Sequence, residues 1–190
     1  MSGNTNVAVE ICSAALNLVG ADEILSFSDE SKEAKLCNSL YPIYRDALMQ
    51  DYPWRFSLER KQLAQLSNAP LYEFDFAYQL PSDFLRLISA EGAEDYVIVG
   101  NEVHTNTSTL RVVYQKKVNE SKFPAYFKMV LQTRLASILA IALREDVNME
   151  TRYQSSFLRE LIRAKSIDSQ QQPNSVMPTN NFLLRNTRTF

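Results

Sequence analysis

The sequence predicts an α+β protein, built as an antiparallel four-helix bundle with an inserted small antiparallel β-sheet and an extended C-terminal tail. Two observations lead to this fold. Apolar residues recur every three to four positions near both ends of the 190-residue chain, as they do in amphipathic helices. Between these regions lie short β-branched and aromatic segments separated by turn residues, which is typical of strands. A polar segment without either pattern closes the chain.

Two helices are predicted at the start of the chain, over about 5–19 and 29–51. Gly20 stands where a residue in the left-handed conformation can end the first helix. Pro42 lies inside the second helix and removes one backbone donor, which predicts a kink or a break there. The apolar stripes are Val7, Ile11, Ala14, Ala15 and Leu18 in the first helix, and Ala34, Cys37, Tyr41, Tyr44 and Leu48 in the second.

A β-rich insertion is predicted over about 54–118. Alternating aromatic residues indicate one strand, and the turn-forming pair Gly100-Asn101 between two short segments predicts a hairpin. Trp54 and Phe56 are expected to fill the junction between helices and sheet. The strand segments are Phe74, Phe76 and Tyr78, then 97–99 with 102–105, and 110–114, where Leu110, Val112 and Tyr114 share one face.

Two further helices are predicted over about 124–143 and 149–168. Pro124 suits the first helical position of one, and Asn148 can cap the other. Their apolar stripes are Phe127, Leu131, Leu135, Ile138 and Ala142, followed by Tyr153, Phe157, Leu161 and Ala164.

The patterned residues 1–168 are expected to form one domain, and 169–190 an extended tail. The tail begins with a run of serine, glutamine, proline and asparagine that cannot bury enough apolar surface to order itself. Its second half carries apolar and basic side chains among polar ones, a composition that suits docking to a partner. These side chains are Phe182, Leu183, Leu184, Arg185, Arg188 and Phe190.

Residues suited to catalysis or cofactor binding form no recognisable constellation. His104 is the only histidine and stands alone in a predicted strand, which makes it a poor general base or metal ligand. The four glycines, at positions 3, 20, 92 and 100, allow neither a P-loop nor a dinucleotide fingerprint. Cys12 and Cys37 are expected to be buried, reduced thiols. The chain is therefore predicted not to be an enzyme and to need no metal or cofactor.

Charge is nearly balanced, with 20 basic and 22 acidic side chains, and it gives no sign of a direct grip on nucleic acid. No apolar run reaches the roughly 20 residues that cross a bilayer, and no export signal is evident, so a protein that is neither exported nor in a membrane is expected. An alternative function is a small regulatory or nucleic-acid-binding protein. Such a protein would contact phosphates through a basic patch of Arg111, Lys116, Lys117 and Lys122. The favoured interpretation of these four residues is an ordinary solvated surface.

Three groups of residues occur in an order and spacing that resemble a known family. The first group contains Ala14-Ala15-Leu16-Asn17-Leu18-Val19-Gly20, Ile24, Ala34, Cys37, Tyr41-Pro42-Ile43-Tyr44-Arg45-Asp46-Ala47-Leu48 and Trp54-Arg55-Phe56. The second is Tyr78-Gln79-Leu80-Pro81-Ser82-Asp83-Phe84-Leu85-Arg86-Leu87. The third contains Val113-Tyr114, Phe123-Pro124, Phe127 and Leu135-Ala136-Ser137-Ile138-Leu139-Ala140. With these groups the chain resembles the head-to-tail connector, or adaptor, family of tailed bacteriophages, which includes tail tubular protein A. The resemblance reaches to about Asp168, and residues 177–190 match no shared motif.

The resemblance implies a structural protein of the virion, made in the host cytoplasm and placed at the head-to-tail interface. Members form a ring, usually of about twelve subunits, that joins the phage portal protein to a tail nozzle or tail tube protein. DNA passes through the lumen without sequence-specific binding. The resemblance further implies a helical bundle, a sheet that faces the tail or neighbouring subunits, and a C-terminal segment that clasps the portal. The six apolar and basic tail residues are therefore the predicted portal contacts.

Overall fold

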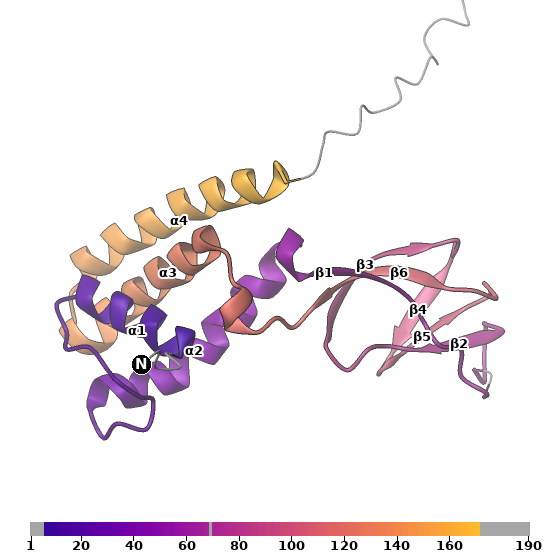
Figure 1. The fold of residues 1–190 in the computed structure, drawn as a ribbon, viewed down its shortest axis with the longest axis horizontal. Coiled ribbons are helices and arrows are strands. Elements are labelled where there is room, and N and C mark those ends of the chain that lie inside the picture. The colour runs from indigo at the N-terminus through magenta and orange to yellow at the C-terminus, as the bar shows by residue number, and fades with distance from the viewer. Residues whose placement is uncertain (1–5, 69, 172–190) are drawn as a thin grey trace, which may run out of the picture.

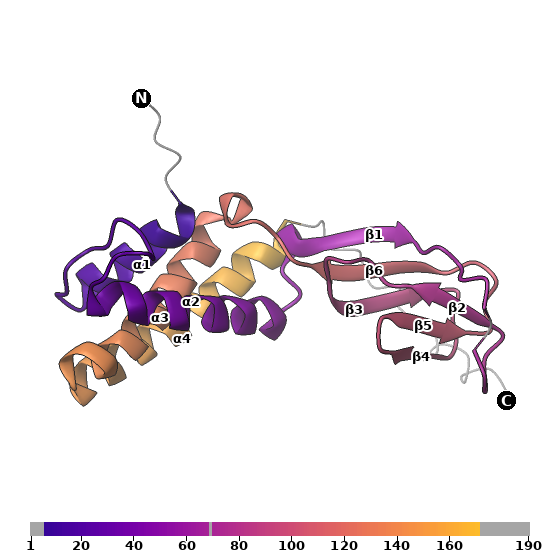
Figure 2. The same ribbon diagram turned by 90° about the horizontal axis from the view of Figure 1, so that it is seen from below.

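Helices and strands lie at opposite ends of an elongated molecule (Figures 1 and 2). The computed structural model describes residues 6–68 and 70–171. Within them, the helical part consists of α1 Val7–Leu18, α2 Lys32–Asp51, α3 Ala125–Arg144 and α4 Val147–Ser169. The strand part consists of β1 Leu58–Gln62, β2 Phe76–Gln79, β3 Phe84–Glu91, β4 Tyr96–Val99, β5 Glu102–Thr105 and β6 Arg111–Lys116. Two short 3-10 helices, η1 Arg55–Ser57 and η2 Glu120–Lys122, lie between the two parts in the chain.

Local capping chemistry sets the helix boundaries, which differ from the predicted ranges by at most three residues. Asn6 precedes α1, and its side-chain oxygen accepts a hydrogen bond from the Ala8 N–H at 3.1 Å. Gly20, with a φ of 68°, follows the end of α1 and confirms the predicted stop. Asp146 caps α4 in place of the predicted Asn148, because its carboxylate accepts from the Met149 N–H at 2.9 Å.

Pro42 lies inside α2 without interrupting it, so of the predicted kink or break the break is wrong. The proline ring removes the N–H that would bond to the carbonyl of Asn38, four residues earlier. Asn38 is exposed, and water can therefore satisfy its carbonyl. Loss of one backbone hydrogen bond on the solvent side does not end a helix when tertiary packing holds the residues on both sides of it in place.

The α+β class is right, but the predicted four-helix bundle with one inserted sheet is wrong. Instead, α3 is the central helix: α4 lies antiparallel along it, and α1 and α2 pack against it as well. With 12 residues against 20 to 23 in the others, α1 is roughly 18 Å long and cannot line a common core over the length of the rest. Periodicity predicted the apolar face of each helix, but not the helix that each face would meet.

Because neighbouring helices cover it, α3 carries buried apolar residues over much of its surface. They are Phe127, Val130, Leu131, Leu135, Ala136, Leu139 and Ala140. Among the described helices, α3 alone is long and apolar enough to cross a membrane by length and composition, and 44% of that stretch is buried within the protein. Packing against α1, α2 and α4 accounts for this apolar character.

The strands form two three-stranded antiparallel sheets, not the single sheet that was predicted. Their strand orders are β1-β6-β3 and β2-β5-β4. In the first sheet β6 is central, with Leu58 of β1 opposite Gln115. In the second, the predicted hairpin is confirmed: Val99 of β4 pairs with Glu102 of β5, and Gly100 supplies the positive φ of 58° that a two-residue turn requires.

Each part has its own hydrophobic core. In the strand part, Tyr78, Val103 and Tyr114 are almost fully buried together. The helical core includes Trp54, whose ring centroid lies 5.2 Å from that of Phe127. Trp54 thus belongs to the helical core, at the point where the chain leaves the helices for β1.

Gln115 of β6 joins the two parts. Its side chain has no exposed surface, and Nε2 donates to the carbonyl oxygen of Tyr52 at 3.0 Å and to the hydroxyl of Ser57 at 3.1 Å. The carbonyl of Met49, near the end of α2, accepts from the same amide. Since a buried polar group left unpaired costs about 1–3 kcal/mol, these bonds fix the position of β6 against the end of α2.

Candidate functional site

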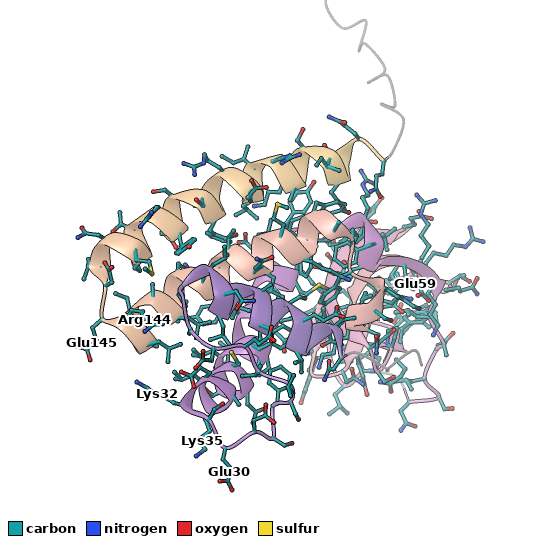
Figure 3. All side chains as sticks on the ribbon, turned by 60° about the vertical axis from the view of Figure 1, so that its left-hand side comes forward. Glu30, Lys32, Lys35, Glu59, Arg144 and Glu145 are labelled. Carbon is teal, nitrogen blue, oxygen red and sulfur yellow. The ribbon has the colours of Figure 1, made fainter. Side chains whose placement is uncertain are left out.

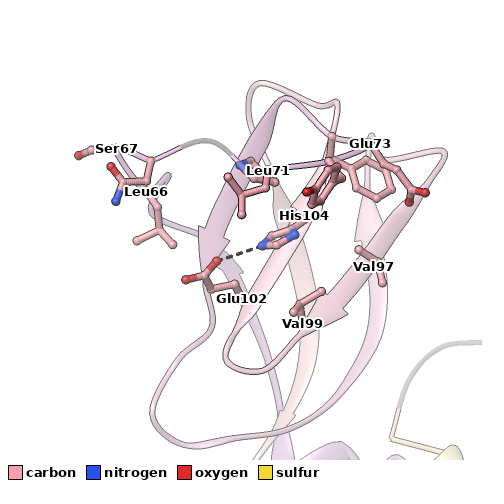
Figure 4. Close-up of a pocket in the computed structure, with 12 residues that line it drawn as sticks. Leu66, Ser67, Leu71, Glu73, Val97, Val99, Glu102 and His104 are labelled. Atoms are coloured by element: carbon pink, nitrogen blue, oxygen red, sulfur yellow. Dashed lines mark hydrogen bonds and ion pairs between the residues drawn. The ribbon is translucent and has the colours of Figure 1, made fainter.

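A pocket of about 760 Å³ lies in the strand part, between the segment that precedes β2 and the outer side of β4 and β5 (Figure 4). His104 and Glu102 of β5 both line it, with His104 Nε2 and Glu102 Oε2 3.0 Å apart. Most of the remaining wall is apolar and consists of Leu66, Pro70, Leu71, Tyr72, Phe74, Val97 and Val99. The pocket is therefore an apolar hollow with an acidic rim, to which Glu73 also contributes.

The geometry of this pocket suits binding better than catalysis. Ser67 also lines the pocket, but it points away from the His104 imidazole (Figure 4). A general base must lie within hydrogen-bond reach of the group that it activates. Among residues 6–68 and 70–171, no three His, Cys, Asp or Glu side chains are grouped so that they could hold a metal ion. Glu102 orients His104, and nothing in the described pocket gives that pair a nucleophile to activate.

An apolar edge strand borders the pocket. β4 is the outer strand in the order β2-β5-β4, and all four of its residues are exposed, from 40% at Val97 and Ile98 to 52% at Val99. Leu71, on the facing segment, is 89% exposed. Single exposed apolar residues are ordinary, but four in succession on an open edge favour pairing with another strand.

A second apolar surface lies on the outer side of α4. Leu158 and Ile162 are one helical turn apart and are 50% and 72% exposed. Arg159 and Arg163 flank them and are exposed as well. An apolar strip with basic neighbours on the exposed side of a helix indicates a protein–protein contact.

The groove between α2 and α4 is built around Arg134 of α3. Its guanidinium carbon lies 5.3 Å from the ring centroid of Tyr44 and 5.2 Å from that of Phe157. Arg134 also donates to the Gln154 side-chain oxygen at 2.6 Å. The two cation–π contacts and the hydrogen bond tie three helices together, so this groove of about 310 Å³ has a structural explanation.

Charges of both signs lie at the end of the helical part farthest from the strands. Glu30, Lys32 and Lys35 project from the start of α2 and the loop before it (Figure 3). Arg144 instead turns back to α1, where its Nε donates to the carbonyl of Val19 at 3.1 Å. The mixture gives no single-sign field of the kind that holds DNA phosphates.

The basic patch considered from the sequence is divided in the structure, because one of its members lies apart from another. Arg111 and Lys116 lie at the two ends of β6, roughly 16 Å apart along the strand. Lys116 forms an ion pair with Glu59 of β1, and this contact raises the pKa of the lysine. Lys117 and Lys122 are exposed beyond the strand. The structure therefore separates Arg111 from Lys116 and pairs Lys116 with Glu59, so the four basic side chains do not form one unpaired phosphate-binding surface.

Asp168, predicted only as the end of a helix, is a buried carboxylate that holds α4 against the start of the strand part. It accepts hydrogen bonds from the Arg55 backbone N–H at 2.9 Å and from the Tyr126 hydroxyl at 2.6 Å. Burial, together with the bond to Asp168, raises the pKa of Tyr126. A signal for this role exists in the sequence, because Asp168 continues the apolar stripe through Leu161 and Ala164 at helical spacing.

Cys12 of α1 and Cys37 of α2 are buried and unbridged, as predicted. A hydrogen bond with Cys37 and burial raise the pKa of the Cys12 thiol. Because its proton is retained, the Cys12 thiol is a poor nucleophile and metal ligand. The role of both cysteines in the structure is to pack α1 against α2.

The six predicted portal contacts, Phe182 to Leu184, Arg185, Arg188 and Phe190, lie outside the described residues. No protein-family model matches the chain, and no curated protein matches it either. The likeness to phage connectors therefore depends on the residue groups quoted in the sequence analysis.

Proposed function

We propose that the chain is a structural subunit of a tailed-phage virion, a head-to-tail connector that forms a ring of about twelve copies. The ring would join the portal protein to a tail nozzle or tail tube protein, and DNA would pass through its lumen without sequence-specific binding. The protein would be made in the host cytoplasm and would have no enzymatic activity, cofactor or membrane partner.

The two-part architecture is the observation that carries this proposal. A connector must present different surfaces to two components and keep them at a fixed separation. Here a helical core and a strand core are distinct, and the buried side chain of Gln115 fixes one part against the other, while that of Asp168 holds α4 against η1 at the junction. Exposed apolar surfaces lie on both parts, at α4 and at β4, and such surfaces support contacts between proteins.

Charge is compatible with a DNA conduit. The net charge is −2 and Lys116 is paired with Glu59, so the chain carries no excess of basic side chains to bind phosphate. Each phosphate that a protein neutralises strengthens DNA binding through counterion release, so a strongly basic lumen would retain DNA during ejection. A lumen wall that is nearly neutral or acidic would let the DNA pass.

The tail supplies the direct test of portal binding. Twelve tails on one ring act at raised effective concentration, so weak single contacts can give tight binding. A variant truncated after Gln172 is expected to lose at least tenfold in affinity for portal rings of the same phage, measured by biolayer interferometry. Thr179→Ala in the full chain is the matched control and should bind normally. Undiminished binding of the truncated variant would overturn the docking role of the tail.

A regulatory or nucleic-acid-binding function is the alternative, and a salt titration separates the two. A protein that uses Lys116, Lys117 and Lys122 on DNA would lose affinity with salt at a log–log slope of about −0.9 per phosphate contacted. The connector proposal predicts no such steep dependence, and no change when the three lysines are replaced by glutamine. A steep slope that these substitutions flatten would favour the alternative.

A further inference from the structure

We propose that neighbouring copies of this chain join by strand pairing, with the open edge of β4 in one copy added to the open edge of β1 in the next. The inference rests on the proposed ring and names the contact that would close it. The strand part has an exposed apolar edge, β4, without the proline, lysine or bulge that usually protects such edges from pairing.

The outer edge of β4 is ready to accept a strand. In a two-residue hairpin the residues next to the turn form a hydrogen-bonded pair, here Val99 with Glu102, and bonded pairs recur at every second position. Ile98 and Tyr96 therefore direct their N–H and C=O groups away from β5, toward the open side. No proline or lysine interrupts β4, and its register with β5 has no bulge.

β1 is the matching edge. It is the outer strand in the order β1-β6-β3 and pairs with β6 on its other side. β3, the remaining outer strand of that sheet, lies toward β2 of the second sheet, whereas β1 and β4 lie on opposite sides of the strand part (Figure 2). Two unlike edges on opposite sides give a head-to-tail contact, the kind of contact from which a closed ring is built when the rotation between copies closes.

Charge favours the mixed contact over pairing of like edges. Arg60 and Lys61 of β1 are exposed, and so are Glu94 and Asp95, immediately before β4. Within the described residues, none of these four side chains forms an ion pair. Two β1 edges would bring basic residues together, and two β4 edges would bring acidic flanks together. A β1 edge beside a β4 edge instead pairs opposite charges.

Cross-linking of isotopically mixed protein tests the contact. Equal amounts of ¹⁴N- and ¹⁵N-labelled full chain are mixed when dilute, concentrated, and treated with a carbodiimide that couples a lysine amine to a touching carboxylate. Peptides joining Lys61 to Glu94 or Asp95 are expected with one label of each kind. The ion pair between Lys116 and Glu59 lies within one chain and is the internal control, which must cross-link with matching labels only.

Variants sharpen the result. Ile98→Lys is expected to remove the mixed-label cross-links and to weaken self-association about tenfold or more by mass photometry. Ile43→Lys, at a 62% exposed position on α2, is the matched control and should do neither. Replacing Arg60 and Lys61 of β1 by glutamate is expected to weaken self-association. Adding Glu94→Lys and Asp95→Lys to that variant is expected to restore it, because opposite charges again face each other.

Absence of mixed-label links from Lys61, in both free and portal-bound protein, would overturn the inference. If portal binding persists in that case, the connector function stands and only the strand contact falls. If the links form but the portal is not bound, the contact stands and the connector function falls.

Discussion

Replacing Asp168 by alanine is expected to destabilise the helical part strongly. The carboxylate has no exposed surface and accepts bonds from the Arg55 N–H and the Tyr126 hydroxyl. A hydrogen bond to a charged group contributes about 1.5–3 kcal/mol, and the substitution leaves two partly buried donors without their acceptor. We expect a loss of about 3–5 kcal/mol in the free energy of unfolding, since water entering the small space recovers part of the cost.

Urea unfolding followed by tryptophan fluorescence measures this loss. Trp54 is the only tryptophan and is fully buried in the helical core, with its ring centroid 6.3 Å from that of Tyr126. Asp22→Ala, in an exposed loop, is the matched control and should change stability by less than about 0.5 kcal/mol. Tyr126→Phe should cost less than Asp168→Ala, and the double variant little more than Asp168→Ala alone, because both remove one network. A loss below about 1 kcal/mol for Asp168→Ala would show that the hydrogen bonds to Asp168 do not hold the helical part together.

Three further predictions concern other parts of the molecule. Burial and the charge of Asp83 raise the pKa of Tyr114 to about 12, against about 10 in an unfolded chain. The contribution of the protonated Tyr114 to stability is therefore complete below pH 10 and is lost as the pH rises through 12. Tyr114→Phe should remove one transition near pH 12 from the phenolate absorbance titration. Loss of a transition near pH 10 instead would contradict this prediction. Cys12 and Cys37 should both resist a thiol reagent in the folded protein and both react in urea, and rapid labelling of either in the native state would show that the α1–α2 contact is open. Gly100→Val should lower the free energy of unfolding by about 1–2 kcal/mol through the positive φ of 58° alone, since a Cβ there meets nothing within 4 Å. Gly100→Asn should lower it less, because asparagine adopts a positive φ more readily. Equal denaturation midpoints for the two variants would argue against a backbone effect.

Helices could be predicted closely because their signals are local. The left-handed Gly20 and the apolar period of α3 depend on neighbours within a few residues, and both agree with the structure. The same holds for the hairpin at Gly100-Asn101. Pro42 shows the limit of such rules, since packing of α2 overrides the loss of one hydrogen bond.

The arrangement of the helices and strands in space and the buried polar contacts could not be predicted from local sequence signals. β1 has the sequence Leu-Glu-Arg-Lys-Gln, without apolar alternation, and it is a strand because β6 pairs with it from about 50 residues away in the chain. Gln115 faces the end of α2, a contact that depends on how two separate cores meet. Which sheet each strand joins is likewise a matter of long-range pairing, and for this reason one sheet was expected where two exist.

The tail contacts lie outside the described residues, so the proposed portal site is known from composition and position only. The edge of β4, by contrast, could have been suspected from the sequence. The run Tyr96-Val97-Ile98-Val99 is apolar on both faces, and a hairpin strand of that kind is either covered on both sides or left exposed at an edge. The structure shows the second case.

Electron microscopy of the full chain bound to portal rings of its phage distinguishes a connector ring from other assemblies. We expect a closed ring of about twelve copies on the portal axis, with an open channel through its centre and strand parts touching between neighbours. Single copies scattered on the portal, a two-fold dimer, or a ring with a blocked centre would contradict this expectation.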